Sequence, residues 1–151
     1  MHHHMPYARL AGMTVLSFIA MYILMYAMVD RFDNVYPNTN QAYMAGLMAA
    51  PMVLIELLLM KDMYPNTKAN YAIVAGAVAL TAVFFFSIRS QALIGDDQFL
   101  RSMIPHHSGA ILMCERATIE DPGIKQLCGT IIDGQRREIA EMRAKLNERN
   151  K

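Results

Sequence analysis

Three long apolar segments constrain what this chain can fold into. Residues 10–29 and 71–88 contain no charged side chain, and residues 42–60 contain one, Glu56. About twenty apolar residues in a helix extend roughly 30 Å, which is the thickness of the hydrocarbon core of a bilayer. The sequence therefore predicts three transmembrane helices in a multi-pass protein whose surroundings are the lipid bilayer.

Charged side chains lie in the connecting segments, near the N-terminus and after residue 88. The formal net charge is +1, and no basic cluster is interleaved with aromatic residues, which argues against nucleic acid as a partner. His2–His4 have two open interpretations, the remnant of a purification tag or a small metal-capturing cluster. The pattern predicts three parts: a His-containing tail (1–9), a three-span region (10–90) and a C-terminal helical-hairpin domain (91–151).

The positively charged residues predict an orientation. With three spans, Arg9, Lys61 and Lys68 share one side of the membrane, whereas Arg31 and Arg89 share the other side with the C-terminal domain. Short cytoplasmic loops carry the excess of positive residues, so we expect the N-terminus inside. The protein is then expected in the inner (cytoplasmic) membrane, with its C-terminal domain periplasmic or extracellular.

Methionine is abundant, with 14 residues in the chain. In the second apolar segment Met48, Met52 and Glu56 recur at every fourth position. Methionine is flexible and fills gaps between helices, so packing is one interpretation. The other is a thioether path for a soft cation such as Cu(I), because an ionisable residue inside a span is costly and often functional. Glu56, Met48 and Met52 are therefore candidates for an intramembrane site.

The C-terminal domain is predicted to be an antiparallel helical hairpin. Apolar residues recur at three- and four-residue steps over 97–120 and 124–147, and Asp121-Pro-Gly separates the two segments. A tight turn near residue 121 would place Cys114 opposite Cys128. Outside the cytoplasm, two facing cysteines are expected to form a disulfide.

The same register predicts partners for His107. It lies on the buried stripe of its helix, where an imidazole needs a polar neighbour. Gln135 is expected opposite it, with Glu138 one turn away. Two interpretations stay open here, a structural hydrogen-bonded network of the three side chains and a metal site.

The hairpin also resembles a known family in its sequence. It contains the run Met103-Ile-Pro-His-His107 and, in the second helix, Gln135-x-x-Glu138-Ile-x-x-Met142. These motifs resemble the domain-of-unknown-function 305 family, whose members are ferritin-like helical proteins, some associated with copper outside the cytoplasm. The resemblance implies metal binding through Met103, His106, His107, Met113 and Met142.

The ligand types favour copper as the cofactor, in the Cu(I) state. Thioether sulfur suits Cu(I), and imidazole suits either copper state. Met103 and His107 are four residues apart on one helical face, and Met142 is expected near the same level on the facing helix. Gln135 and Glu138 are expected to support the site without binding the ion, with Glu138 orienting the His107 ring.

The chain departs from that family in two ways. Larger members carry two such hairpins, which complete a four-helix bundle, and alanine is usual where Cys114 and Cys128 stand. One hairpin alone would leave Phe99, Ile104 and Ile132 without cover. We therefore expect a homo-oligomer in which two hairpins complete the bundle.

The predicted fold class is all-α, with three transmembrane helices followed by a two-helix antiparallel hairpin. The predicted function is that of a membrane-anchored protein that binds or handles copper outside the cytoplasm. The alternative is a structural oligomeric membrane protein whose hairpin mediates assembly without metal. An enzyme is not expected, because neither hairpin helix carries an E-x-x-H pair and no nucleophile is paired with a base.

Overall fold

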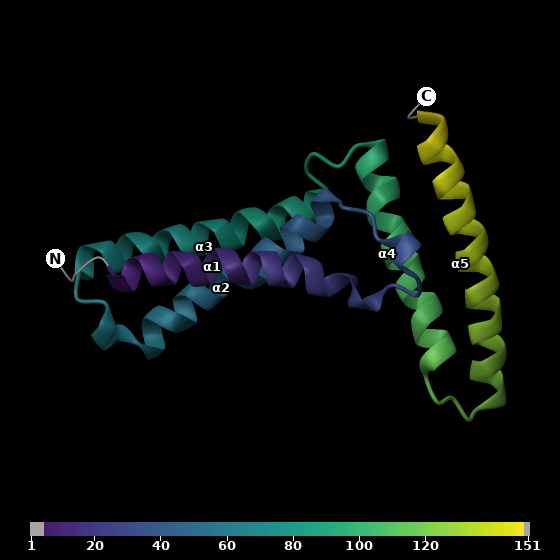
Figure 1. Ribbon diagram of the computed structural model, residues 1–151, viewed down its shortest axis with the longest axis horizontal. Helices are drawn as coiled ribbons and strands as arrows, with labels where there is room; N and C mark the ends of the chain where they lie inside the picture. Colours follow the sequence, from purple (N-terminus) through teal and green to yellow (C-terminus); the bar gives the residue numbers. More distant parts are fainter. Residues whose placement is uncertain (1–4, 150–151) are drawn as a thin grey trace. The chain divides into compact units, whose positions relative to one another are not determined.

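The computed structural model describes residues 5–149, which form an all-α fold (Figure 1). This confirms the all-α part of the predicted fold class, since the described residues contain five α-helices and no strand. The α-helices are α1 (Met5–Leu24), α2 (Thr39–Leu59), α3 (Thr67–Ser90), α4 (Asp96–Arg116) and α5 (Pro122–Arg149). Three short 3₁₀ helices are η1 (Met25–Met28), η2 (Phe32–Asn34) and η3 (Lys61–Met63).

Three segments are long and apolar enough to cross a membrane, which is the character of a membrane protein. They are Met5–Met28, Thr39–Leu59 and Thr67–Ser90, of 24, 21 and 24 residues. Each overlaps one of the predicted spans and begins three to five residues earlier; the first two end one residue before the predicted span does, and the third ends two residues after it. The prediction of three long apolar helices is therefore confirmed, with earlier starts.

The chain divides into two compact units. One contains α1, α2 and α3, and the other contains α4, α5 and the segment Met25–Thr39. The predicted division of the chain includes this segment in the three-span region, as the connector between the first two spans. In the structure its residues pack with the hairpin, for reasons given below.

The three-helix unit has a small core of its own. Leu10 of α1, Val53 and Leu57 of α2 and Ala77 of α3 are buried together with Tyr64, which follows η3. Most other apolar side chains of these helices are exposed, as expected for helices that face lipid.

Helices α2 and α3 also meet at a glycine. A Cβ on Gly46 would lie 2.5 Å from the ring of Phe84, so the ring occupies the space that a side chain would need. Any larger residue at Gly46 would have to displace the Phe84 ring.

The hairpin of α4 and α5 is defined at both ends by local signals. The Asp121 side chain accepts a hydrogen bond from the Ile124 N–H (2.9 Å), so it caps α5, and Pro122 takes the first helical position. At the opposite end of the hairpin, Arg149 forms ion pairs with Asp96 and Asp97 in the first turn of α4. These exposed pairs fix the register of the two helices more than they stabilise them.

The loop of the hairpin is longer than the tight turn that the sequence suggested. Helix α4 ends at Arg116, before the expected end near residue 120, and α5 starts at Pro122. Residues near the loop keep the expected pairing, since Cys114 and Cys128 are joined by a disulfide with their Cα atoms 5.3 Å apart. Farther along, the pairing has moved by about one helical turn, so that His107 contacts Glu138.

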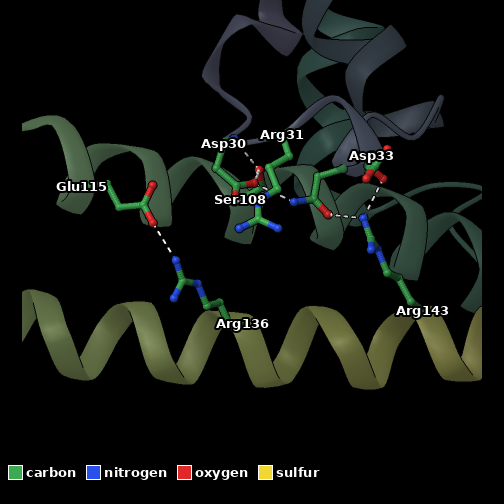
Figure 2. A network of polar contacts seen from close by, with 8 residues as sticks. Asp30, Arg31, Asp33, Ser108, Glu115, Arg136 and Arg143 are labelled. Atoms are coloured by element: carbon green, nitrogen blue, oxygen red, sulfur yellow. Dashed lines mark hydrogen bonds and ion pairs between the residues drawn. The ribbon is translucent and has the colours of Figure 1, made fainter.

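The segment Met25–Thr39 packs on the hairpin through polar contacts (Figure 2). The Asp30 N–H donates to the Ser108 hydroxyl (2.7 Å), which itself donates to the Asp30 carboxylate. From α5, Arg143 donates to the Asp33 carbonyl (2.7 Å) and to the Asn34 side chain (2.8 Å). Ser108 is fully buried, so its hydroxyl needs these partners.

This packing corrects the expectation that Ile104 would lack cover. Ile104 is fully buried in a core that also contains Leu100, Ile111, Ile139, Met142 and Leu146. Tyr36 of the connector packs against this core, so the chain itself covers a face that we had assigned to a second hairpin. Ile132 is partly buried against the same core, and Phe99 is exposed.

A first prediction concerns the disulfide. Because it closes a loop with a sequence separation of 14, it should contribute about 3 kcal/mol, or about a hundredfold in the opening equilibrium of the hairpin. Reduction of the full-length protein in detergent should raise hydrogen exchange at residues 111–131 by that factor. The Cys114→Ser/Cys128→Ser variant should show the raised exchange without reductant and no further response to it. Unchanged exchange on reduction would contradict the prediction.

A second prediction concerns the buried hydroxyl. Ser108→Ala should destabilise the docked connector by about 1–3 kcal/mol, because it removes the acceptor of the Asp30 N–H and one of the donors to the Asp30 carboxylate, which keeps its bond from Asn34. Hydrogen exchange at residues 29–38 should rise accordingly. Ser102→Ala is the matched control on the same helix, because the Ser102 hydroxyl bonds to the Phe99 carbonyl of α4 itself. Equal effects of the two variants would refute the role of Ser108.

A third prediction is a pH dependence of the same contact. Burial raises the pKa of Asp30, but hydrogen bonds from Ser108 and Asn34 lower it, and the net shift is downward. Docking should therefore be fully stabilised above the ordinary aspartate pKa of about 3.9, and that stability should be lost as the pH falls through the lower pKa of the folded state. Asp30→Asn should remove this acid response of residues 29–38. Asp33→Asn should keep it, because Arg143 contacts only the Asp33 carbonyl.

Candidate metal-binding residues

The most distinctive side-chain pair in the hairpin is His107 with Glu138. Nδ1 of His107, on α4, lies 2.9 Å from a carboxylate oxygen of Glu138, on α5. The His107 side chain is 15% exposed and that of Glu138 is 54% exposed, so the pair sits at the edge of the interface between the helices. The carboxylate lies off the hydrogen-bonding direction of the ring, and buried Nδ1 has no hydrogen-bond partner. A small rotation of the exposed Glu138 would align the two.

The fold holds His107 in place from the neighbouring turn positions. Ile104 and Ile111, one turn before and one turn after, are both fully buried, and Ser108 anchors the connector. The imidazole therefore belongs to a stretch of α4 that is packed on both sides. This apolar packing fixes the position of the ring, but it supplies no hydrogen-bond partner for the ring nitrogens.

Two of the predicted thioether ligands lie in the same apolar cluster of the hairpin. Met142 of α5 is buried, and Met103 of α4 is half-buried and packs against the cluster that contains it. Met103 is also one turn from His107 on α4, as its spacing predicts. The structure thus brings one thioether from each helix into the interface.

The other two predicted ligands lie elsewhere. His106 is exposed, with its ring centroid 5.9 Å from that of His107, and Met113 is 55% exposed. The five predicted ligands therefore do not gather at one point. Gln135, expected opposite His107, is half-buried, and the contact of His107 on α5 is with Glu138.

The donor types limit which ions the hairpin could hold. Among residues 5–149 there is no group of three or more His, Cys, Asp or Glu side chains that could hold a metal ion. Both cysteines are used in the disulfide and supply no thiolate. A site here must therefore combine imidazole with thioether sulfur. His2–His4 lie outside the described residues.

The three-helix unit of α1, α2 and α3 contains a second candidate site. The Tyr64 hydroxyl donates to the Glu56 carboxylate (3.1 Å), beside a cavity of about 220 Å³. Of the predicted set, Glu56 and Met52 line this cavity, whereas Met48 does not and is 45% exposed. The complete lining is Met13, Met52, Ile55, Glu56, Leu59 and Met60.

Sequence reasoning missed Met13 and the anchoring pair of Ser108 with Asp30. Ser108 carries a usable signal, since it stands four residues after Ile104 and three before Ile111, within the buried stripe. A lone hydroxyl in such a stripe predicts a polar partner from elsewhere in the chain. Met13 has no comparable signal, because its position is set only by how α1 packs on α2.

Comparison with known proteins gives a family match for the hairpin and a relative that is similar over most of the chain. The model of the family described as domain of unknown function (DUF305) matches residues 89–150. An uncharacterized protein of Acanthamoeba polyphaga mimivirus is 36% identical over 140 residues, which cover 91% of this chain and 90% of that protein. No solved structure matches the chain. The chain belongs to the DUF305 family, which confirms the resemblance seen in its hairpin motifs.

Proposed function

We propose that this protein is a membrane-anchored metal-binding protein whose hairpin binds copper, as Cu(I), outside the cytoplasm. The observation that carries the proposal is the contact of His107 Nδ1 with the Glu138 carboxylate. Metal-binding histidines commonly donate one ring N–H to a carboxylate, which fixes the tautomer and leaves the other nitrogen for the ion. His107 and Glu138 have the residue types and the separation that this arrangement needs.

The neighbouring donors support a soft ion. Met103 and Met142 supply thioether sulfur at the interface where His107 lies, and thioethers favour Cu(I) over zinc or magnesium. In the structure Nδ1 is buried without a hydrogen bond, so a small rotation of Glu138 that completes this bond would remove an unfavourable burial and fix the ring with its other nitrogen free for the ion. Glu138 would orient the ring, and His107, Met103 and Met142 would hold the ion.

The location outside the cytoplasm rests on two observations. The Cys114–Cys128 disulfide is a bond that persists in oxidising compartments and is rare where glutathione keeps thiols reduced. The positively charged residues of the connectors favour the same side for the hairpin. An inner or cytoplasmic membrane with a periplasmic or extracellular hairpin satisfies both.

The exposed residues His106 and Met113 take a different role in this proposal. They are seven residues apart on α4, so they lie on one outward face, away from the buried thioether of Met142. They could add donors only from outside the hairpin interface, for example beside a second copy of the chain. Their loss should therefore leave the His107 site largely intact.

The test is competition for Cu(I) against a colourimetric chelator, with the full-length protein in detergent. His107→Ala and Met103→Leu should each weaken binding by at least tenfold, because each removes a ligand. Glu138→Gln should weaken it less, since the amide can still orient the ring. His106→Ala is the matched control on the same helix and should bind as the wild type does. Wild-type affinity in both ligand variants, with intact helical circular dichroism, would refute the site.

A second candidate function is assembly without metal. Phe99, Met113, Ile124 and Leu127 are exposed on the hairpin, and the α3 face with Ala75 and Gly76 is also open, with no atom within 4 Å of a Cβ built on Gly76. Such surfaces suit a homo-oligomer, with hairpins completing a bundle and small residues allowing helices to approach closely. The protein mass in mild detergent, measured with and without Cu(I), separates the two candidates. An oligomer that is indifferent to metal favours assembly.

A further inference from the structure

A cavity in the three-helix unit is lined by three methionines and a single carboxylate. It has a volume of about 220 Å³, and Met13 of α1 lines it together with Met52, Glu56 and Met60. We propose that this cavity binds a soft monovalent cation, Cu(I) or its analogue Ag(I), through the Glu56 carboxylate and these three thioethers. The site uses no residue of the hairpin, so it does not rest on the function proposed for His107.

The donor set selects the class of ion. Besides Glu56, the lining residues are three methionines, which carry the remaining polarisable donors, and the aliphatic residues Ile55 and Leu59. Thioethers are neutral, soft ligands that bind Cu(I) and Ag(I) and have little affinity for magnesium or calcium. Methionine also has three rotatable side-chain bonds, so several sulfurs can converge on one ion without movement of the backbone.

The charge balance selects a monovalent ion. Glu56 lies one turn before the end of α2, inside a segment apolar enough to span a membrane. Charge in such surroundings is costly unless it is neutralised. One carboxylate with one monovalent cation is neutral, whereas a divalent ion would leave a net positive charge. The single carboxylate and neutral sulfurs therefore match Cu(I) or Ag(I).

Tyr64 holds the carboxylate in place. Its hydroxyl donates to one oxygen of Glu56 (3.1 Å), which leaves the second oxygen of the carboxylate for a cation. Tyr64 is itself buried, and its ring packs against that of Tyr7, with ring centroids 5.4 Å apart. Tyr7 in turn donates to the side chain of Asn70 (2.9 Å). The carboxylate is thus positioned by residues that are fixed before any ion binds.

Helix geometry explains which methionines belong to the site. Met52, Glu56 and Met60 are four residues apart, so successive side chains are rotated by about 40° and remain on one side of α2. The Met60 N–H bonds to the Glu56 carbonyl (2.9 Å), which continues this turn past the end of the helix. One more step back, at Met48, the side chain has rotated out of the cavity and is exposed. Met13 reaches the same cavity from α1.

The competing explanation is that Glu56 serves only to hold Tyr64 in the core. That role requires the hydrogen bond between these two side chains and makes no use of sulfur. Replacing methionine by leucine keeps the volume and the apolar character, so it should leave a purely structural role unchanged. Loss of ion binding in the methionine variants therefore distinguishes a site from a structural contact.

The experiment is Ag(I) binding by the full-length protein in detergent and chloride-free nitrate buffer, measured as bound silver per chain after gel filtration. The background is His107→Ala, which removes the hairpin ligand. Met13→Leu/Met52→Leu in this background should lose one equivalent of silver, and Glu56→Gln should weaken binding at least tenfold. Met44→Leu/Met48→Leu is the matched control, because both of its methionines are exposed on α2 and outside the cavity. It should retain that equivalent.

Two results would overturn the proposal. One is equal silver in the Met13→Leu/Met52→Leu variant and in its parent, with helical circular dichroism and elution volume unchanged. The other is an equal loss in the Met44→Leu/Met48→Leu control, which would mean adventitious binding to exposed sulfur. A thermal shift on adding Ag(I) gives an independent readout, expected in the parent and control and absent in the site variant. If the hairpin did not bind copper, the expected differences in silver binding between the cavity variants and their control would be unchanged.

Discussion

Two helices that pack only on each other leave their outer faces exposed. In this protein the connector Met25–Thr39 packs on α4 and covers part of that surface. Tyr36 packs on the hairpin core, while Ser108 and Arg143 bind the backbone and side chains of residues 30–34. Ile104 is fully buried as a result. The connector follows the first apolar segment directly in the sequence, so the hairpin core includes residues from well outside the hairpin.

This docking also determines how His107 can act. Ser108 is bonded to Asp30, so the turn of α4 that carries His107 cannot rotate to optimise a contact. The adjustable partner is instead Glu138, which is more than half exposed. The proposed ion site would use this pair as it stands, with the imidazole held by α4 and the exposed carboxylate able to adjust to it, whereas a closed structural network would bury and align both partners.

Much of the fold could be predicted because its signals are local. Uncharged length marks the spans, three- and four-residue periodicity marks the hairpin helices, and the loop at Asp121 brings Cys114 toward Cys128. The predicted register places Gln135 opposite His107 and Glu138 one turn away, as the residue that orients the ring. The structure shows the contact with Glu138, and the shift along α5 depends on where α4 ends, which periodicity does not show. The docked connector and the contribution of Met13 depend on contacts between distant parts of the chain, which a pattern of residues along one helix does not encode.

The similarity to the viral protein includes the apolar helices as well as the hairpin. The family model matches only residues 89–150, but the similarity extends over 140 residues and thus takes in most of the membrane-spanning segments. A hairpin that needed only tethering could be joined to any apolar helix. In this chain the connector between the first two spans is part of the hairpin core, and the spans carry a carboxylate among thioethers. The first connector and the apolar segments thus carry features that a simple tether would not need, and the functions proposed above use both of them.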